Sequence, residues 1–439
     1  MIRMKTFKSA LLGSVFAVTF SMSLAGSVSA ASLMDDVAAM LSVHERIKAA
    51  EADVAAARAN LDVSKGGYYP TASITSNVGH EKIYTQNPLA TATKTSMAQR
   101  EVDLGLKQTL FDFGATDASV EGSSLSVDQA LATLEQTRQA VLLAGLSAQL
   151  NLASAKRVLD HQIQSEANIK RQTDLEHARV EIGSGISTNE LQSKTQLAGA
   201  QAARVRAQGA LRQAVNRYRA VFETVPADLE KIEVPDVSRV VLPTSEEELV
   251  RVALEDNPQV LVTSIAAEIA NATIASSFAT GYRPVVTASV DQKYKRDVGG
   301  TIGDKNEMLV KVEATFDFNM GWTAQNTLLA AKSSHSAAAS RLKDTRNQIE
   351  EQARNAWQRL ETARLNADFL ENQAHIATEF LGLARKELAL GQRSLIDVLS
   401  GETSLINALV AADRAKTDVD IAILTVLNTM GKLELSVLQ

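Results

Sequence analysis

Cysteine is absent from this chain of 439 residues. The absence excludes disulfides, thiolate metal sites and a cysteine that could carry a lipid anchor. Aromatic residues make up only 4% of the chain, so the composition favours long helices over a globular core built around large rings. The net charge of -6 and the lack of a basic patch interleaved with aromatics argue against a nucleic-acid-binding surface.

Residues that could perform chemistry are also sparse. The sequence contains no glycine-rich loop that could cradle a phosphate. The six histidines show no paired ligand spacing: His44, His80, His161, His177, His335 and His375. The sequence therefore predicts neither an enzyme nor a metal or cofactor site, and transport by such a chain would need a powered partner.

Proline is rare and unevenly placed. None occurs between residues 89 and 225 or after residue 284. Because proline inside a helix costs roughly 3 kcal/mol, these two tracts permit very long helices. The seven prolines are Pro70, Pro88, Pro226, Pro235, Pro243, Pro258 and Pro284.

The first thirty residues have the parts of a secretion signal. Arg3, Lys5 and Lys8 form a basic start, Ala10–Leu24 is an apolar run, and small residues end at Ala30. We expect cleavage after residue 30 and export of the mature chain. The alternative is a short membrane anchor, but the run is shorter than the roughly 20 residues that a span requires.

The chain repeats itself once. Three motifs recur in one order and at nearly one offset, which indicates an internal duplication. The pairs are Tyr68-Tyr69-Pro70 with Tyr282-Arg283-Pro284 (284 − 70 = 214), Leu110–Phe113 with Thr315–Phe318 (318 − 113 = 205), and Ala178–Glu181 with Ala384–Glu387 (384 − 178 = 206). We predict a first repeat over 31–222, a linker over 223–244 and a second repeat over 245–439.

Each repeat contains a pair of long helices. Apolar residues spaced by three and four predict helices over about 115–182, 188–221, 324–390 and 394–430. At 1.5 Å per residue, the first of these is a rod of about 100 Å. Its apolar stripe is thin, so it must pack laterally on partners.

Each repeat also contains a strand hairpin. Apolar and polar residues alternate along Val102–Leu110 and Met308–Phe318, and we predict strands over about 70–80, 101–111, 284–294 and 307–318. Runs of roughly 10 residues suit tilted membrane strands. The loops between them, 81–100 and 295–306, are polar. A soluble sheet remains the alternative for any single strand.

Four strands cannot close a membrane barrel, and an open sheet edge is not tolerated in lipid. We therefore expect several copies of the chain to share one barrel. Two, three or four copies would supply 8, 12 or 16 strands.

In this order, the motifs resemble the TolC family of outer-membrane efflux and type I secretion channels. The matching pieces are Asn257-Pro258, Tyr282-Arg283-Pro284, Leu110-Phe111-Asp112-Phe113-Gly114, and Gly391 followed by Asp397-Val398-Leu399. The resemblance implies a mainly α fold with a membrane β-barrel portion: a homotrimer with one 12-stranded outer-membrane barrel, continued by a helical tunnel through the periplasm of a Gram-negative cell. It places the linker in a belt around the tunnel.

Two helix breaks fall at corresponding places in the repeats. Gly183 and Gly185 mark the first break and Gly391 marks the second, because glycine permits the left-handed backbone that ends a helix. Ser394 is suited to start the next helix, with Asp397 near the positive end of its dipole. A purely structural role for Ser394 and Asp397 stays open.

The resemblance implies a pore gate at these breaks. Gly391, Arg393 and Asp397 match a family pattern in which the Asp projects into the pore and the Arg ties neighbouring helices together. The acidic partner from the first repeat maps to Glu190, one residue further from Gly183 than the pattern requires. We expect an Arg393–Glu190 contact, worth about 0–1 kcal/mol if exposed.

Two departures from the family pattern weaken this expected gate. Ser400 stands where some members have a second pore Asp, and Leu388 stands where some have a Tyr. A periplasmic adaptor is expected to dock at the same tips, on Gly183, Gly185, Ser187, Gly391 and Ser394.

The predicted function is the outer-membrane exit channel of a type I secretion system, served by an inner-membrane ABC transporter and an adaptor. The alternative within transport is multidrug or solvent efflux with a proton-driven pump. A periplasmic coiled-coil structural protein is the alternative from another class, but it leaves the two strand hairpins unexplained.

Overall fold

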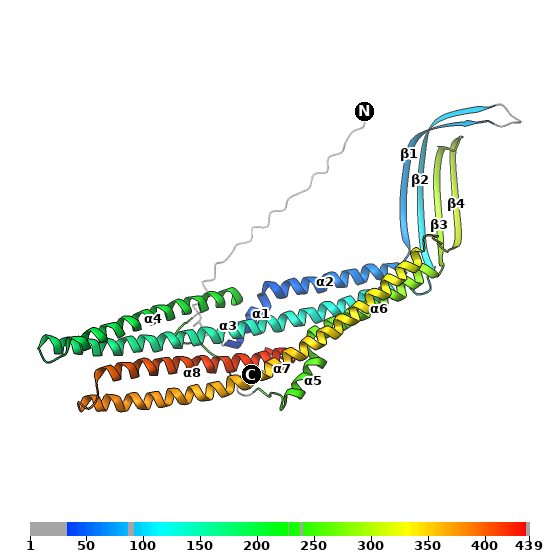
Figure 1. Cartoon of the computed structure of the whole chain (residues 1–439). Coiled ribbons are helices and arrows are strands. Elements are labelled where there is room, and N and C mark those ends of the chain that lie inside the picture. The colour runs from blue at the N-terminus through cyan, green and yellow to red at the C-terminus, as the bar shows by residue number, and fades with distance from the viewer. Residues whose placement is uncertain (1–32, 87–91, 227, 238–239, 436–439) are drawn as a thin grey trace, which may run out of the picture.

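The computed structural model describes residues 33–86, 92–226, 228–237 and 240–435. The signal predicted over 1–30 lies outside the described residues. Long helices lie side by side, with a curved sheet at one end of the molecule and two helical tips at the other (Figure 1).

Four long helices form two antiparallel pairs. They are α3 (Ala115–Glu181), α4 (Ser187–Phe222), α7 (Thr323–Ala389) and α8 (Leu395–Thr429), and each end lies within one residue of the predicted position. Figure 1 shows the order α4, α3, α8, α7 across the wall that they form. With 67 residues, α3 and α7 are each about 100 Å long.

Shorter helices complete the wall towards the sheet. They are α1 (Leu33–Val43), α2 (Glu45–Lys65), the 3-10 turn η1 (Gly66–Tyr68), α5 (Glu246–Asp256) and α6 (Pro258–Tyr282). Beyond the ends of α4 and α8, α2 packs on α3, and α6 lies between α3 and α7. By length and composition α6 and α8 could each cross a membrane, but both pack lengthwise in this wall.

Local residues explain how α6 begins. The Asn257 side chain accepts a hydrogen bond from the Gln259 N–H at 2.8 Å, and Pro258 occupies the first turn, where its missing N–H is harmless. The Asn257 amide also donates to the Thr429 carbonyl at 2.9 Å, so the start of α6 is fixed to the end of α8.

The main apolar core lies at mid-length, where helices from both repeats meet. Its fully buried side chains include Val37, Met40, Leu146, Leu249 and Leu424, which come from α1, α3, α5 and α8. This position fixes the two repeats to each other while both ends of the molecule remain a single layer.

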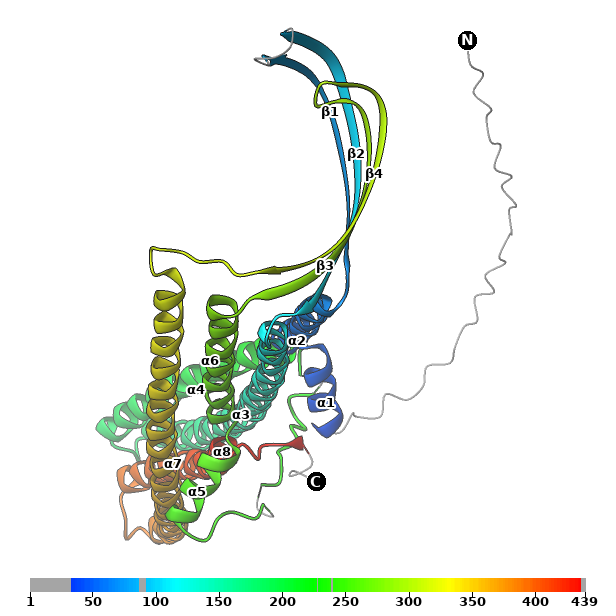
Figure 2. The same cartoon turned by 90° about the vertical axis from the view of Figure 1, so that its right-hand side faces the viewer.

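The sheet is antiparallel with the order β1-β2-β3-β4. Its strands are β1 (Thr71–Thr85), β2 (Thr93–Phe111), β3 (Val285–Val298) and β4 (Thr301–Thr315). Figure 2 shows the four strands rising together from the helical end as one curved layer. Within one chain, β1 and β4 each have a free edge.

The prediction that residues 81–100 and 295–306 form polar loops is wrong for most of both ranges, because strands extend into them. The first hairpin stays paired out to Thr85 and Thr93, and the second turns tightly between Val298 and Thr301. Backbone hydrogen bonds need no apolar side chains, so polarity did not mark the strand ends. The strand predicted to reach 318 ends at Thr315, because the chain leaves the sheet there to reach α7.

The two faces of the sheet differ in chemistry. One face carries exposed apolar side chains, including Ile74, Leu104, Leu106 and Val310. The other carries ion pairs between strands: Lys293 Nζ lies 3.6 Å from Asp103, and Lys295 Nζ lies 2.9 Å from Glu307 and 3.5 Å from Glu101. An apolar outside and a charged inside are what a membrane barrel with an aqueous lumen requires.

Candidate gate at the helical tips

Both tips end their long helix in the same way. Gly183 and Gly391 have φ angles of 76° and 74°, in the left-handed region that favours glycine. The Gly183 N–H donates to the Val180 carbonyl at 3.0 Å, and the Gly391 N–H donates to the Leu388 carbonyl at 3.0 Å. These turns satisfy the last carbonyls of α3 and α7 and are related by one offset, 391 − 183 = 208.

The helices that follow the two turns, α4 and α8, begin in different ways. The Ser394 hydroxyl accepts a hydrogen bond from the Asp397 N–H at 3.3 Å and caps α8. Ile186 takes the corresponding position before α4 (394 − 186 = 208) and provides no side-chain cap. Ser187 is therefore the first residue of α4 rather than its cap.

Gly185 is needed for a reason other than the predicted one. It lies outside the left-handed region. A side chain there would place its Cβ 2.7 Å from the Val180 nitrogen, so the loop can approach the end of α3 only with glycine at this position.

The common offset gives the position in the second repeat that corresponds to Glu190. The two turns have equal length, so Asp397 corresponds to Asn189 (397 − 208 = 189), and Glu190 corresponds to Val398. Asp397 is exposed in the first turn of α8, whereas Val398 is buried beneath it. Asn189 of the first tip therefore corresponds to Asp397 of the second, and the pore roles of Glu190 and Asp397 stay predictions.

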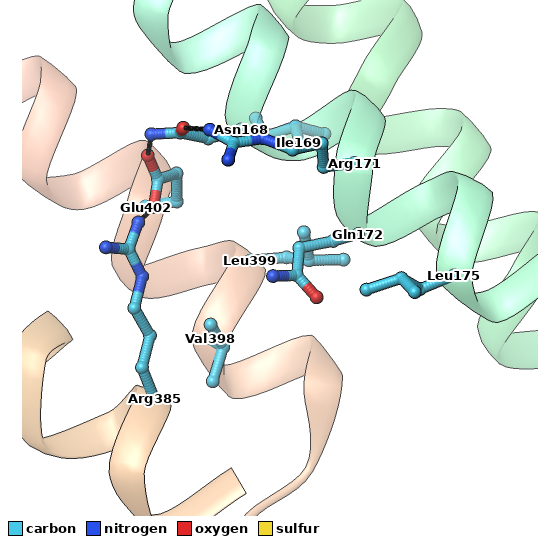
Figure 3. A pocket seen from close by; sticks show the side chains of 9 residues that line it. All are labelled: Asn168, Ile169, Arg171, Gln172, Leu175, Arg385, Val398, Leu399 and Glu402. Atoms are coloured by element: carbon cyan, nitrogen blue, oxygen red, sulfur yellow. Dashed lines mark hydrogen bonds and ion pairs between the residues drawn. The ribbon is translucent and has the colours of Figure 1, made fainter. Parts of the chain in front are cut away.

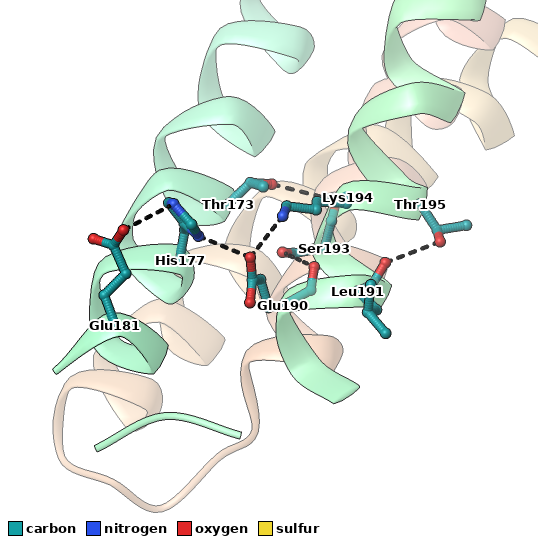
Figure 4. Close-up of polar contacts among 8 residues, drawn as sticks. All are labelled: Thr173, His177, Glu181, Glu190, Leu191, Ser193, Lys194 and Thr195. Atoms are coloured by element: carbon teal, nitrogen blue, oxygen red, sulfur yellow. Dashed lines mark hydrogen bonds and ion pairs between the residues drawn. The ribbon is translucent and has the colours of Figure 1, made fainter. Parts of the chain in front are cut away.

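Glu190 joins α3 to α4 within one chain. Its Oε1 lies 2.6 Å from Lys194 Nζ and 2.8 Å from His177 Nδ1 (Figure 4). His177 Nε2 lies 3.5 Å from Glu181, so one imidazole contacts carboxylates from both helices. The hydrogen bond from Lys194, followed by that from His177, lowers the pKa of Glu190 below its usual 4.5.

Arg393 is held within its own hairpin. Its Nε lies 2.6 Å from Glu387 Oε2, and its guanidinium carbon lies 5.2 Å from the centroid of the Phe380 ring. The predicted Arg393–Glu190 contact does not form within one described chain, because the glycine turn at 391 folds Arg393 back onto the last turns of α7.

A cluster that sequence reasoning missed lies further along the tips. Glu402 of α8 is only 4% exposed. Its carboxylate accepts hydrogen bonds from Asn168 Nδ2 of α3 and from Arg385 Nη2 of α7, each at 2.5 Å (Figure 3). Arg171 Nη2 donates to the side-chain oxygen Oδ1 of Asn168 at 2.8 Å. Through the Asn168–Glu402 contact, this cluster links the two repeats.

The Glu402 cluster borders a cleft of about 350 Å³ between α3 and α8. Apolar side chains of Ile169, Val398 and Leu399 share this cleft with the charged groups. The available signal in the sequence was Glu402 itself, since a carboxylate three residues after Leu399 interrupts the apolar stripe of α8.

Comparison with known proteins identifies similar chains. The sequence model described as "Outer membrane efflux protein" matches residues 38–222, which lie within the first repeat. Outer membrane efflux protein BepC of Brucella suis is 23% identical over 377 residues, which cover 85% of this chain and 79% of the relative.

Solved outer-membrane channels share the fold. OprN superimposes with a TM-score of 0.77 at 19% identity, covering 91% of this chain and 89% of OprN. CmeC of Campylobacter jejuni gives 0.76 at 15% identity, covering 91% and 86%. The open state of MtrE from Neisseria gonorrhoeae gives 0.75 at 16% identity, covering 91% and 88%. The predicted fold class is confirmed, because the chain has the fold of these solved channels.

Proposed function

We propose that the chain belongs to the outer membrane efflux protein family, forms an outer-membrane efflux channel and serves as the exit duct of a tripartite export system. The observation that carries the proposal is the continuous single-layer wall, in which a sheet with one apolar and one charged face passes directly into helices about 100 Å long. Such a wall can enclose a duct from the membrane through the periplasm.

The free edges support a closed ring of three copies. The β1 and β4 edges of one chain would be unsatisfied in lipid, so the β4 edge of each copy would pair with the β1 edge of the next. Three copies of four strands give the 12-stranded barrel that the family resemblance implies.

The helical edges of the wall have complementary shapes. Large exposed apolar side chains recur along α7 at spacings of three, four and seven, whereas two of the four apolar side chains in the exposed stripe along α4 are alanines. We infer that α7 of one copy packs on α4 of the next in a head-to-tail contact that closes the ring. The α7 stripe comprises Leu365, Phe369, Ile376, Phe380, Leu383 and Leu390, and the α4 stripe comprises Leu191, Ala198, Ala202 and Val205.

The gate of this duct would be the ring of six helical tips in the trimer. Three exposed Asp397 carboxylates around one axis would focus a negative potential and favour cations when the pore is narrow. Arg393, through Glu387 and Phe380, fixes the loop that leads into Asp397.

The proposed partners follow from the duct's passive nature. A periplasmic adaptor would dock on the tips around Gly183, Gly185, Ser187, Gly391 and Ser394, and an inner-membrane ABC transporter would supply the energy. The proposed cargo is a secreted protein, as in type I secretion. Efflux of drugs or solvents with a proton-driven pump is the second candidate, favoured by the name of the Brucella relative.

Two experiments test the proposal. Purified protein in planar bilayers should give discrete pores and migrate as a heat-modifiable oligomer, whereas a periplasmic scaffold would give neither. A deletion strain should then be assayed in parallel for loss of a secreted protein and for drug susceptibility. Loss of secretion alone supports type I secretion, and susceptibility alone supports efflux.

A further inference from the structure

A recess of about 590 Å³ lies where the sheet joins the helical wall, between the start of α3 and the end of α6. Its lining combines aromatic rings, one cation and two carboxylates: Phe111, Phe113, Phe278, Arg283, Asp117 and Glu121. The gate and the exit path do not use these residues.

Within the described residues, the Arg283 guanidinium in this recess contacts aromatic rings. The Arg283 guanidinium carbon lies 5.8 Å from the Phe113 centroid and 5.6 Å from the Phe278 centroid. Phe111 meets Phe113 edge to face at 4.6 Å, which extends the aromatic floor. Over the described residues Arg283 forms no ion pair, so its N–H donors are free for an anion.

The carboxylates of the recess come from one face of α3. Asp117 Oδ1 accepts a hydrogen bond from the Tyr68 hydroxyl at 2.7 Å, which fixes its position. Glu121 follows one helical turn later, on the same face. The recess thus presents a positive group from the end of α6 opposite two negative groups from α3.

A strand irregularity turns the recess towards the apolar side of the sheet. The register of β2 against β3 shifts between Thr109 and Phe111, which pairs Phe111 with Val286. Val286 shares a face with Val290, which pairs with Leu106 on the apolar side. The aromatic floor is therefore continuous with the apolar face of the sheet.

We propose that this recess binds the headgroup of a zwitterionic phospholipid that carries a primary amine, a site that rests on the proposed placement of the sheet in the membrane. Arg283 binds the phosphate, Glu121 and Asp117 bind the ammonium group, and the acyl chains lie along Phe111 and the apolar face above it. Such a lipid fixes the depth of the barrel at the joint between strands and helices.

The arrangement selects against two related ligands. A lipid with a phosphate but no amine leaves Glu121 facing an anionic headgroup without a counter-charge. A free phosphate ester of ethanolamine satisfies the charges but leaves the aromatic floor uncovered, so it gains none of the apolar contact.

The test is lipid binding to the purified, delipidated oligomer, measured by native mass spectrometry. Phosphatidylethanolamine should bind about tenfold more tightly than phosphatidylglycerol of the same acyl chains. Arg283→Gln should weaken both lipids by about tenfold, and Glu121→Gln should abolish the preference between them. Arg359→Gln, which changes an exposed arginine at mid-length on α7, is the matched control and should leave binding unchanged.

Equal binding of the two lipids to the unmodified protein would overturn the site, as would normal binding to Arg283→Gln. Equally tight binding of glycerophosphoethanolamine would also overturn it, in favour of a soluble ester. If Arg283→Gln fails to form the oligomer, Glu121→Gln provides the test. Loss of its preference for phosphatidylethanolamine over phosphatidylglycerol supports the site, and retention of that preference overturns it. An oligomer that conducts in bilayers without lipid selectivity refutes the lipid site alone, whereas absence of conductance refutes the proposed function.

Discussion

Single charged side chains at the tips have distinct neighbours, and these neighbours suggest distinct roles. Arg393 is tied to its own hairpin, Glu190 joins α3 to α4, and Glu402 joins both repeats. Their burial differs as well, since Glu402 is buried while Arg393 is partly accessible. Loss of Arg393 should therefore shift a conformational equilibrium, and loss of Glu402 should also reduce stability.

Arg393→Ala should raise the mean conductance of single channels. Each of three ion pairs with Glu387 contributes about 0.5 kcal/mol, so losing all three changes the ratio of open to closed channels by about tenfold. Planar-bilayer recordings measure this ratio. Gln392→Ala, at the neighbouring exposed position, is the control. Unchanged conductance in Arg393→Ala would remove Arg393 from the gate.

Glu402→Leu should loosen the contact between the repeats near the tips. The substitution leaves Asn168 and Arg385 without their acceptor, at a cost of about 1–3 kcal/mol per chain. Hydrogen exchange should accelerate in the last turns of α7 and the first turns of α8. Glu361→Gln, at an exposed position of α7, should have no such effect. If exchange at the tips stays slow in Glu402→Leu, the cluster does not hold the repeats together.

The long helices α3 and α7 end at turns in which a glycine adopts a left-handed backbone conformation. The glycines at 183 and 391 have left-handed conformations, whereas Gly199 lies in the middle of α4 with open space around it. Replacing glycine by alanine should therefore reduce stability at the turns and increase it in the middle of α4. The α3–α4 tip adds a pH-dependent element, because Glu190 links the two helices through charge.

Gly391→Ala should destabilise the α7–α8 hairpin by about 1–2 kcal/mol, because alanine is strained in the left-handed region. Gly199→Ala should stabilise α4 by about 0.5–1 kcal/mol, because alanine loses less conformational freedom in a helix. Denaturant unfolding monitored by the helical circular dichroism signal gives both values. Equal effects of the two substitutions would contradict the assigned backbone roles.

Acidification should loosen the α3–α4 tip. The pKa of Glu190 is lowered in the folded chain, so its contribution is complete above its ordinary value of 4.5 and is lost as the pH falls through the lower folded value. Hydrogen exchange of residues 177–194, corrected for the intrinsic pH dependence, should show increased opening below this range. Glu190→Gln should remove that pH dependence, and an identical profile in both proteins would refute the link.

The molecule as a whole is an incomplete wall. Both sheet edges are free within one chain, and α7 exposes an apolar stripe at one margin of the helices. We infer that a wall whose main core lies at mid-length, with two small clusters near the tips, gains its remaining packing from neighbouring copies. Substitutions at the edges of the wall should accordingly affect assembly more than substitutions on its outer surface.

Phe369→Glu should prevent stable oligomers. The Phe369 side chain is 71% exposed in one chain, and its burial at each contact is worth about 1.5–3 kcal/mol. Heat-modifiable migration and size-exclusion chromatography in detergent report the oligomer. Arg364→Gln changes the net charge by the same one unit on another side of α7 and should assemble normally. Normal assembly of Phe369→Glu would exclude the proposed contact between α7 and α4.

Local signals in the amino-acid sequence determined the helices, the strand hairpins and the duplication. Tracts without proline, glycine stops and alternating polarity act over a few residues, so the ends of α3, α4, α7 and α8 follow from nearby residues. The outer ends of the hairpins did not follow, because backbone pairing continues through polar side chains. The belt role of residues 223–244 stays a prediction.

The tertiary structure alone decided which charges meet. Asn168 and Glu402 are 234 positions apart, and only the packing of α3 on α8 brings them within 2.5 Å. Likewise, the equal length of the two turns aligns Asp397 with Asn189 rather than with Glu190. A side chain's partner depends on the helix that packs beside it, and no signal local to the chain specifies that neighbour.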